Sequence, residues 1–421
     1  MHKNSYFYIL YPKLRSNMTE KESALYSHYI IDGIRQEATP AELLEECMEY
    51  DDAYTMPAQA FNDIIDESTE PPLSSFSYDI NEFNDYLALT TKASKKERSF
   101  RMLYPRHFTT LQITRALIGR LWNEGHFRLG NLNLWGQWEW NTRPLGNMAA
   151  FYESVSAAGE YIYSVEVKLR DYLFIEEDEE SSAKFYAWLP EINEESVFET
   201  DADEQKVEID IDDKGNQEVE VRPLFKSSPY ESKHPWISES RKCPSVMDNV
   251  PDSWIIYIPF DTCQYRLGGS LFAQVMNRNG GQAPEINDPD YFIDCFEVVR
   301  ELVEDGVIKA GITIADGGMA TAAARFCGDL GLSLDLNGIS SSYQENDRLR
   351  ILFGEVPGVL IQIEESDYDY VDSQLILQDI AYYPVGHPSG EFKGIRIKDT
   401  RKSGVADILA SLLEQASEGE D

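Results

Sequence analysis

Two pairs of adjacent glycines, each between an expected strand and an expected helix, constrain this chain more than any other feature. Gly268-Gly269 lies in the loop 267–270, before a helix expected to reach 279–281, and Gly317-Gly318 follows an expected strand at 307–314. Glycine has no Cβ, so the backbone can approach a ligand and its N–H groups can face an anion. For either pair alone a tight turn before a helix is the preferred interpretation, so the surrounding segments must decide.

Strand-like and helix-like segments alternate around these glycines. Trp254–Pro259 is a continuous apolar run that predicts a buried strand, and later strands are expected at 333–336 and 359–363. Asp288-Pro289 predicts the start of a helix that ends at Gly306. The pattern predicts an α/β domain over residues 251–390, followed within 391–421 by a helix near 403–415 and an acidic tail.

A second set of elements precedes this one and predicts a domain over residues 79–250. A helix is expected around Ile113–Leu121, an aromatic-rich strand at 131–140 and a further helix around Met148–Ile162. Residues 175–222 form a strongly acidic insertion, in which alternating segments flank a glycine-bearing turn at 212–216 and predict a hairpin. A solvated surface excursion is the preferred interpretation, and an acidic recruitment site is the alternative.

The first 78 residues predict a small α/β extension of unknown type. A strand is expected at 5–10, and Thr19 with Glu22 forms a capping-box pattern. Thr39-Pro40 predicts a second helix start, and 68–77 is expected to be a linker.

The charge balance limits the class of partner. The chain has 74 acidic and 37 basic residues, a formal net charge of −37. This charge repels nucleic acid and anionic membranes, so neither is an expected partner. A small phosphorylated ligand is still compatible with it, because backbone amides can outweigh a global field locally.

Cysteine and histidine spacing predicts neither disulfides nor a metal site. The five cysteines include no C-x-x-C pair, and the six histidines show no H-x-x-x-H or H-E-x-x-H spacing. Such spacing is typical of reduced thiols. Because no apolar run reaches membrane-spanning length either, we expect a cytoplasmic protein.

Four segments of the second domain carry a further signal: RLGGSLFAQV (266–275), VIKAGITIADGGMATAAARF (307–326), GLSLDL (331–336) and LFGEVPGVLIQI (352–363). Together they resemble the last AIR-synthase-type domain of phosphoribosylformylglycinamidine (FGAM) synthase, an amidine-forming ligase of purine biosynthesis. The resemblance places the family's ligand- or phosphate-binding motif positions at Leu267, Gly268, Gly269, Ser270, Asp316, Gly317, Gly318 and Glu355. Capping of the following helix is an equally good interpretation of Asp316. The family's His-Asp pair is replaced by Ile312 and Thr313.

Residues 97–125 and 131–140 resemble the nucleotide-binding domain that precedes it in the family. The resemblance implies an α/β (α+β) architecture of two AIR-synthase-like domains, with mixed sheets packed against helices. Gly130 stands where the family has a Mg²⁺-binding acidic residue, and of its Gly-Lys-Asp-Ser motif only Asp171 remains, within 169–172. The weaker candidates of this domain are Asn131, Asn133 and Asp171.

The resemblance leaves two functions open. The first is ATP- and Mg²⁺-dependent amidine formation, with unassigned catalytic residues and a partner that supplies the family's remaining domains. The second is a non-catalytic relative that binds a nucleotide or small phosphorylated metabolite, or acts as a structural or regulatory partner. Because the family's nucleotide domains pair their sheets, a homodimer or an assembly with a synthase-like partner is implied. The strand 132–140 fits that interface, although ordinary core is the preferred interpretation.

Overall fold

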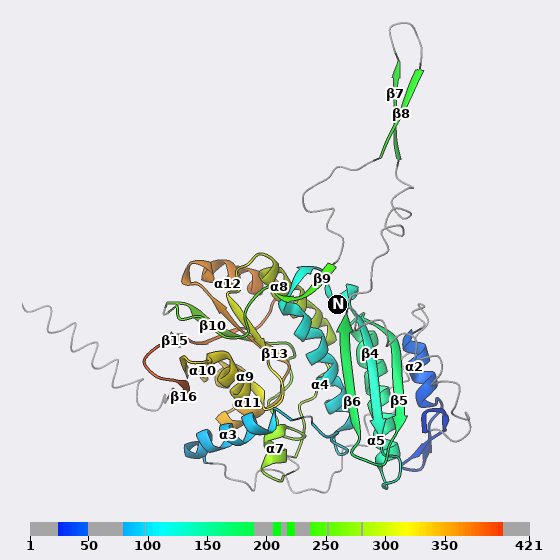
Figure 1. Ribbon diagram of the computed structural model, residues 1–421, viewed down its shortest axis with the longest axis vertical. Helices are drawn as coiled ribbons and strands as arrows, with labels where there is room; N and C mark the ends of the chain where they lie inside the picture. The colour runs from blue at the N-terminus through cyan, green and yellow to red at the C-terminus, as the bar shows by residue number, and fades with distance from the viewer. Residues whose placement is uncertain are drawn as a thin grey trace, which may run out of the picture.

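The computed structural model describes residues 24–48, 79–96, 98–188, 238–250, 252–278 and 281–398, together with the backbone of 205–211, 217–223 and 236–237. Several expectations lie outside these residues: the strand at 5–10, the Thr19 capping box, the linker 68–77, the turn 212–216 and the helix 403–415. The described chain forms an α+β structure (Figure 1). It has two clusters of buried hydrophobic residues.

The first unit is built on a three-stranded mixed sheet in the order β5-β4-β6. Its central strand is parallel to β5 and antiparallel to β6. Two long helices, α4 and α5, pack against each other and cover one face, where Trp138 and Trp140 are fully buried. The bounds are β4 Asn133–Trp140, β5 Lys168–Glu176, β6 Ser182–Trp188, α4 Pro105–Ile118 and α5 Asn147–Ser164. The alternating aromatic pattern of 131–140 thus predicted its strand correctly.

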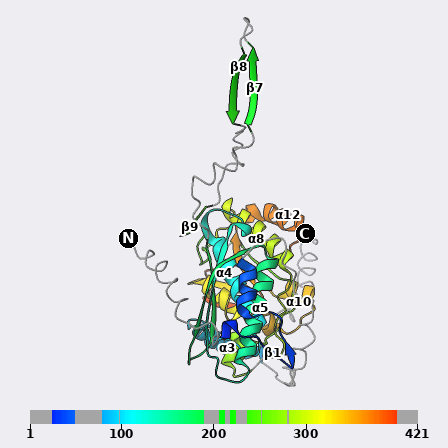
Figure 2. The same cartoon turned by 90° about the vertical axis from the view of Figure 1, so that its right-hand side faces the viewer.

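The described N-terminal segment packs on this unit rather than standing apart. It comprises η1 Ala24–Tyr26, β1 Ile30–Ile31, β2 Ile34–Arg35 and α2 Pro40–Met48. The helix α2 begins as predicted, with the Thr39 N–H donating to Glu42 Oε2 at 2.7 Å. It contacts α5 and β5, and Figure 2 shows it over α5. Leu43 and Leu44 therefore belong to the first hydrophobic cluster, which also includes residues of the second unit.

The second unit contains an antiparallel sheet in the order β11-β13-β10-β14 and a small sheet in the order β15-β12-β16. The expectation of mixed sheets holds for the small sheet, where β12 is parallel to β16, but not for the larger one. The bounds are β10 Trp254–Pro259, β11 Ala310–Thr313, β12 Gly331–Leu334, β13 Gly358–Ile363, β14 Tyr383–Gly386, β15 Pro388–Ser389 and β16 Gly394–Ile397.

Helices surround these sheets. They are α7 Leu271–Val275, α8 Pro289–Glu304, α9 Gly318–Cys327, α10 Asn337–Tyr343, α11 Arg348–Phe353, η6 Glu365–Asp367 and α12 Tyr368–Leu377. The helix α8 begins at Asp288-Pro289 as predicted, and Gly306 follows its end with φ +75°. The helix after the first glycine loop was expected to reach 279–281, but α7 ends at Val275, and Asn277 adopts φ +53°.

One helix of the first half of the chain packs on the second core. After η3 (Ile80–Glu82), α3 (Phe83–Ala93) contacts α7 and α9, and its Phe83 and Tyr86 are buried in the second hydrophobic cluster. The chain then returns through residues 98–104 to α4. This crossing places the segment before α4 between the two units.

Arg300 on α8 joins the units through backbone carbonyls. Its side chain is fully buried and donates to the carbonyls of Leu121 at 2.5 Å, Asn123 at 2.8 Å and Gly125 at 2.7 Å. These carbonyls lie in η4 (Gly119–Trp122) and β3 (Asn123–His126), which pairs with β9 (Trp236–Arg241). The short 3-10 helix η5 (Leu129–Asn131) follows.

The acidic stretch 175–222 contains the predicted hairpin, but it is not an insertion throughout, because residues 182–188 form β6 of the first unit's sheet. Strands β7 (Gln205–Ile211) and β8 (Gln217–Pro223) pair in antiparallel register, with Ile211 opposite Gln217. Among the described helices, none is long and apolar enough to cross a membrane.

Gly311 on β11 leaves the space that the Trp122 ring occupies. A Cβ added at this position would lie 2.1 Å from the ring, so replacement by alanine forces the indole out of the joint between the units. We expect Gly311→Ala to destabilise the fold by about 2 kcal/mol or more, as overpacking of a dense core does. Urea unfolding followed by tryptophan fluorescence measures this. Gly119→Ala is the control, because a Cβ there meets nothing within 4 Å; equal destabilisation by both changes would contradict the prediction.

Candidate functional site

The two glycine loops converge on the carboxylate of Glu355. This residue lies between α11 and β13, and its side chain is 1% exposed. Its Oε1 accepts hydrogen bonds from the N–H of Leu271 at 2.9 Å and the N–H of Gly317 at 2.8 Å. Those amides stand at the beginnings of α7 and α9, where N–H groups have no partner within the helix. One oxygen of Glu355 therefore satisfies both helix starts.

Two arginines of the first unit bind the acidic side of this site. Arg98 Nη1 lies 2.6 Å from Asp316 Oδ1 and 2.8 Å from Glu355 Oε2, and its Nη2 donates to the Gly269 carbonyl. Arg115 on α4 donates to Asp316 Oδ1 at 2.7 Å and lies 3.8 Å from Glu355 Oε2. These ion pairs connect segments more than 200 residues apart in the sequence.

The cluster shifts the pKa values of its members. Burial raises the pKa of Asp316, but the charges of Arg115 and Arg98 outweigh it and lower the pKa to about 2. Burial lowers the pKa of Arg98, and the neighbouring Glu355 and Asp316 outweigh this and raise it. For His107 on α4, burial and then the charges of Arg98 and Arg115 lower the pKa to about 3. Asp316 is therefore ionised and His107 neutral near pH 7.

Two further amides of the glycine loops are bonded within the protein. The N–H of Gly268 donates to the Gln282 carbonyl at 2.8 Å, and the N–H of Gly318 donates to the Ala315 carbonyl at 2.9 Å. Gly317 adopts φ +84°, a conformation that favours glycine. Ser270 caps α7 by accepting from the N–H of Ala273 at 3.1 Å. The observed roles of these residues are turns, caps and bonds to Glu355.

The structure thus brings the eight residues of the last-domain motifs into one region. Leu267 and Ser270 are buried in the first loop, and Asp316 lies at the second. The interpretation of Asp316 as a helix cap is wrong, because Gly317 is the N-cap of α9 and no side chain caps that helix. The Asp316 carboxylate binds arginines instead. A ligand role for the eight residues stays a prediction.

The three weaker candidates make local contacts. Asn131 Oδ1 accepts from the N–H of Arg128 at 2.8 Å, and Asp171 Oδ1 accepts from the N–H of Tyr172 at 2.9 Å. Asn133 is buried at the start of β4. In the part of the chain that the structure describes, none of the three side chains hydrogen-bonds to a glycine loop, so they do not join the Glu355 cluster.

Ile312 and Thr313, which replace the family's polar pair, serve packing between the units. Thr313 Oγ1 accepts from Trp122 Nε1 at 2.8 Å, and Ile312 packs against the second core. Among the described residues, neither side chain makes a hydrogen bond to Arg98 or Arg115. These two residues lack the titratable groups of the family's pair and contribute to packing between the units instead.

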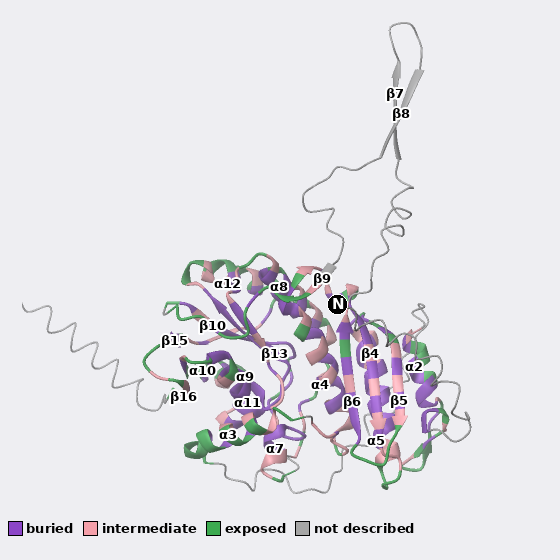
Figure 3. Ribbon diagram, in the orientation of Figure 1, coloured by how far each residue is buried: buried purple, intermediate pink, exposed green. Residues whose placement is uncertain are grey.

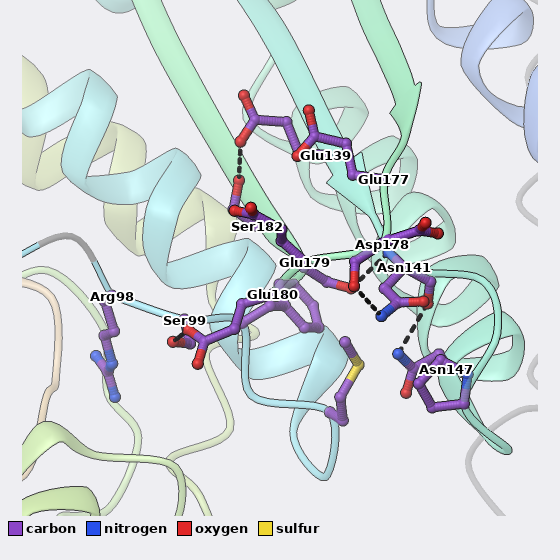
Figure 4. A pocket seen from close by; sticks show the side chains of 14 residues that line it. Arg98, Ser99, Glu139, Asn141, Asn147, Glu177, Asp178, Glu179, Glu180 and Ser182 are labelled. Carbon is purple, nitrogen blue, oxygen red and sulfur yellow. Dashed lines mark hydrogen bonds between the residues drawn. The ribbon is translucent and has the colours of Figure 1, made fainter.

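A cavity of about 890 Å³ adjoins the cluster, with Arg98 in its wall (Figure 4). It lies at the C-terminal end of β4 and beside the turn between β5 and β6. Five carboxylates line it: Glu139, Glu177, Asp178, Glu179 and Glu180. Ser99 and Asn141 also contribute to the wall. The cavity therefore has a strongly acidic surface with one arginine at its edge.

Arg98 and Arg115 are the members of the site that the motifs missed, and they lie in a segment rich in basic residues. Arg98, Arg101, Arg106, His107 and Arg115 fall within eighteen residues of a chain whose net charge is −37. That local excess of basic side chains was the available signal. The sequence placed the segment in a domain, but gave no reason to bring it against the second glycine loop.

The residues present do not fit the Mg²⁺–ATP that the resemblance implies. The helix-start amides of Leu271 and Gly317 already donate to a carboxylate, and a second anion at the same nitrogens would meet its negative charge. Gly130 offers no metal ligand, and Asp171 bonds to its neighbouring amide. No group of three His, Cys, Asp or Glu side chains among the described residues converges as a metal site.

Comparison with curated proteins identifies relatives over part of the chain. A probable phosphoribosylformylglycinamidine synthase, chloroplastic/mitochondrial, of Arabidopsis thaliana is 29% identical over 163 residues, which are 36% of this chain and 11% of the relative. The human phosphoribosylformylglycinamidine synthase is 28% identical over 141 residues, 31% of this chain and 10% of the relative. Part of this chain is related to phosphoribosylformylglycinamidine synthase. It spans about a tenth of the length of these relatives, and no family model matches it.

Solved structures show weaker likenesses. Thermotoga maritima PurL complexed with FGAR is 10% identical with a TM-score of 0.47, covering 70% of this chain and 41% of that chain. The hydrogenase maturation protein HypE in complex with ATP is 11% identical with a TM-score of 0.41, covering 70% of this chain and 76% of that chain.

The low pKa of Asp316 predicts acid sensitivity. The ordinary pKa is 3.8, so the depressed value contributes stability above about pH 4, and this contribution is lost as the pH falls toward 2. We expect Asp316→Asn to cost about 2 kcal/mol at pH 7 and to flatten the pH dependence of unfolding below pH 4. Denaturant unfolding from pH 2 to 7 measures both. Asp294→Asn, at an exposed position of α8, is the control; an unchanged acid profile in Asp316→Asn would contradict the assignment.

Proposed function

We propose that this chain is a non-catalytic relative of FGAM synthase, which binds a phosphorylated metabolite or a nucleotide other than ATP–Mg²⁺ and works beside a partner. The names of the curated relatives support a link to purine biosynthesis. A cytoplasmic location is part of the proposal.

The hydrogen bonds of Glu355 carry the non-catalytic part. Phosphoryl transfer requires donors and cations that are arranged around the transferring group. Here Glu355 takes the amides of Leu271 and Gly317, and Asp316 and Glu355 take the charges of Arg98 and Arg115. The amides and arginines that could stabilise a transferring phosphate are thus already bonded to Glu355 and Asp316. Their arrangement favours a rigid joint between the units over a catalytic cradle.

The second candidate function is the ligase reaction itself. In that reaction ATP phosphorylates the substrate amide and ammonia then displaces phosphate, which gives the amidine. Sequence similarity to two synthases favours it. The residues present do not fit Mg²⁺–ATP, which speaks against the ligase reaction.

Ligand titration and complementation separate these functions. We expect calorimetry to show no saturable binding of ATP–Mg²⁺ to the full chain, because the helix-start amides that could bind its phosphates already donate to Glu355. We also expect no growth when the chain is expressed in a purine auxotroph that lacks FGAM synthase. Saturable binding of ATP–Mg²⁺ together with rescue would overturn the non-catalytic proposal and support the ligase.

The outer face of the β5-β4-β6 sheet is the proposed partner surface. Residues on β4 alternate between buried and half-buried, as Figure 3 shows. The half-buried side carries Trp135, whose ring lies 5.4 Å from that of Tyr186, together with Leu173 and Ile175. The opposite side is covered by α4 and α5. No described helix covers the half-buried side, and its apolar side chains favour pairing with a second sheet, as the resemblance to the family implies.

A charge on this face tests the partner surface. Tyr186 is 51% exposed on β6. We expect Tyr186→Lys to shift the chain toward monomer, because a lysine ammonium would be desolvated between two sheets. Analytical ultracentrifugation over a range of concentrations measures the shift. Tyr370→Lys is the matched control, since Tyr370 is 43% exposed on α12 of the other unit. If the wild-type chain is monomeric at every concentration, the homodimer is excluded and the surface could pair only with a different protein.

A further inference from the structure

The cavity of the first unit has an acidic wall whose charge is only partly balanced. Most of its carboxylates come from the turn 176–180 between β5 and β6. Arg143 pairs with Asp178 of this turn at 2.9 Å. Glu177 and Glu179 are exposed and form no ion pair within the part of the chain that the structure describes. The wall therefore presents free negative charge to a cationic group.

Exposed leucines stand next to the lining of the same cavity. Leu103 follows Met102 in the chain, Leu145 follows Pro144, and both Met102 and Pro144 line the cavity. Leu103 is 59% exposed and Leu145 is fully exposed. Large apolar side chains exposed beside an opening are typical of a surface that binds another apolar segment. The cavity therefore combines free carboxylates with an apolar rim.

A segment of this chain has the complementary chemistry. Residues 6–15, with the sequence YFYILYPKLR, lie outside the described residues and combine an apolar run with Lys13 and Arg15. The first fifteen residues contain three lysines and arginines and no acidic residue, in a chain whose net charge is −37. Because opposite charges attract and apolar surfaces associate in water, such a segment suits an acidic opening with an apolar rim.

The first described residue lies beside this acidic turn. The N–H of Ala24 donates to Glu176 Oε1 at 2.8 Å, and Ala24 is buried. The next residue of the turn, Glu177, already lines the cavity, as Figure 4 shows. Arg15 stands nine positions before Ala24, and a chain of that length spans up to about 30 Å. The anchor at Ala24 therefore keeps the segment within reach of the cavity at a high effective concentration.

We propose that the acidic cavity docks residues 6–15 of the same chain. The basic end of the segment meets the carboxylates of Glu177 and Glu179, and its apolar run covers Leu103 and Leu145. Charge, the apolar rim and the anchor at Ala24 all favour this occupant over a free cation. While the segment is docked, the cavity is closed to any other ligand, so the segment acts as an internal inhibitor of binding there.

Limited proteolysis of the full chain tests the docking. Trypsin cuts after Lys13 and Arg15, and mass spectrometry measures the rate of cleavage at each of them under native conditions. We expect the double variant Glu177→Gln/Glu179→Gln to be cleaved at least about fivefold faster than the wild type, because two exposed ion pairs are lost. High salt should accelerate cleavage of the wild type in the same way, since it screens exposed charges.

Two further variants separate docking from a general attraction between charges. Glu45→Gln/Glu46→Gln removes the same two charges from exposed positions of α2 and should leave the cleavage rate unchanged. Leu145→Ser removes an apolar contact without changing any charge, and we expect cleavage at least about threefold faster than in the wild type. All of these substitutions are at exposed positions, and circular dichroism of each variant shows that it is folded.

The proposal is overturned if the wild type is cleaved as fast as Glu177→Gln/Glu179→Gln, if Glu45→Gln/Glu46→Gln accelerates cleavage equally, or if Leu145→Ser has no effect. Protection that disappears on dilution of the wild type would assign the cavity to the segment of a second copy and overturn docking within one chain. These outcomes are independent of the proposed function, because neither a ligand nor a partner protein is added.

Discussion

Glu355 accepts hydrogen bonds from the starts of two helices with one carboxylate oxygen and binds Arg98 with the other. A carboxylate buried to this degree needs partners on both sides, since an unpaired buried charge costs several kcal/mol or more. The glycine loops supply the amides because glycine lets their backbones come close, and the first unit supplies the cation. The relative placement of the two glycine loops and of the segment before α4 depends on this one group.

Two other contacts between the units also bury a large side chain of one unit against the backbone of the other. Arg300 is fully buried and satisfied by three backbone carbonyls, and Trp122 fills the space that Gly311 leaves. A joint built from such contacts resists relative motion of the units, because every partner would be left unsatisfied in the interior. The site beside it is therefore a rigid one.

Local patterns predicted the elements around the joint well. Trp254–Pro259 forms β10 with the predicted bounds, because a run of apolar residues can be buried on both faces. Asp288-Pro289 begins α8, and the acidic stretch contains its hairpin, because caps and turns are local properties. The local interpretation of Asp316 as a helix cap was wrong, because its carboxylate forms ion pairs with Arg98 and Arg115 instead. Long-range charge outweighed a local preference.

By itself the sequence determined where glycine loops precede helices, which strands are buried and which family the last domain resembles. Each follows from residues close together in the chain. Only the tertiary structure decided what those loops bind. Arg98 and Arg115 lie more than 200 residues from Asp316, in segments whose periodicity carries no information about that partner. The motif that suggested a ligand cradle is thus occupied by Glu355, because folding brings a buried carboxylate and its two arginines to the same helix starts.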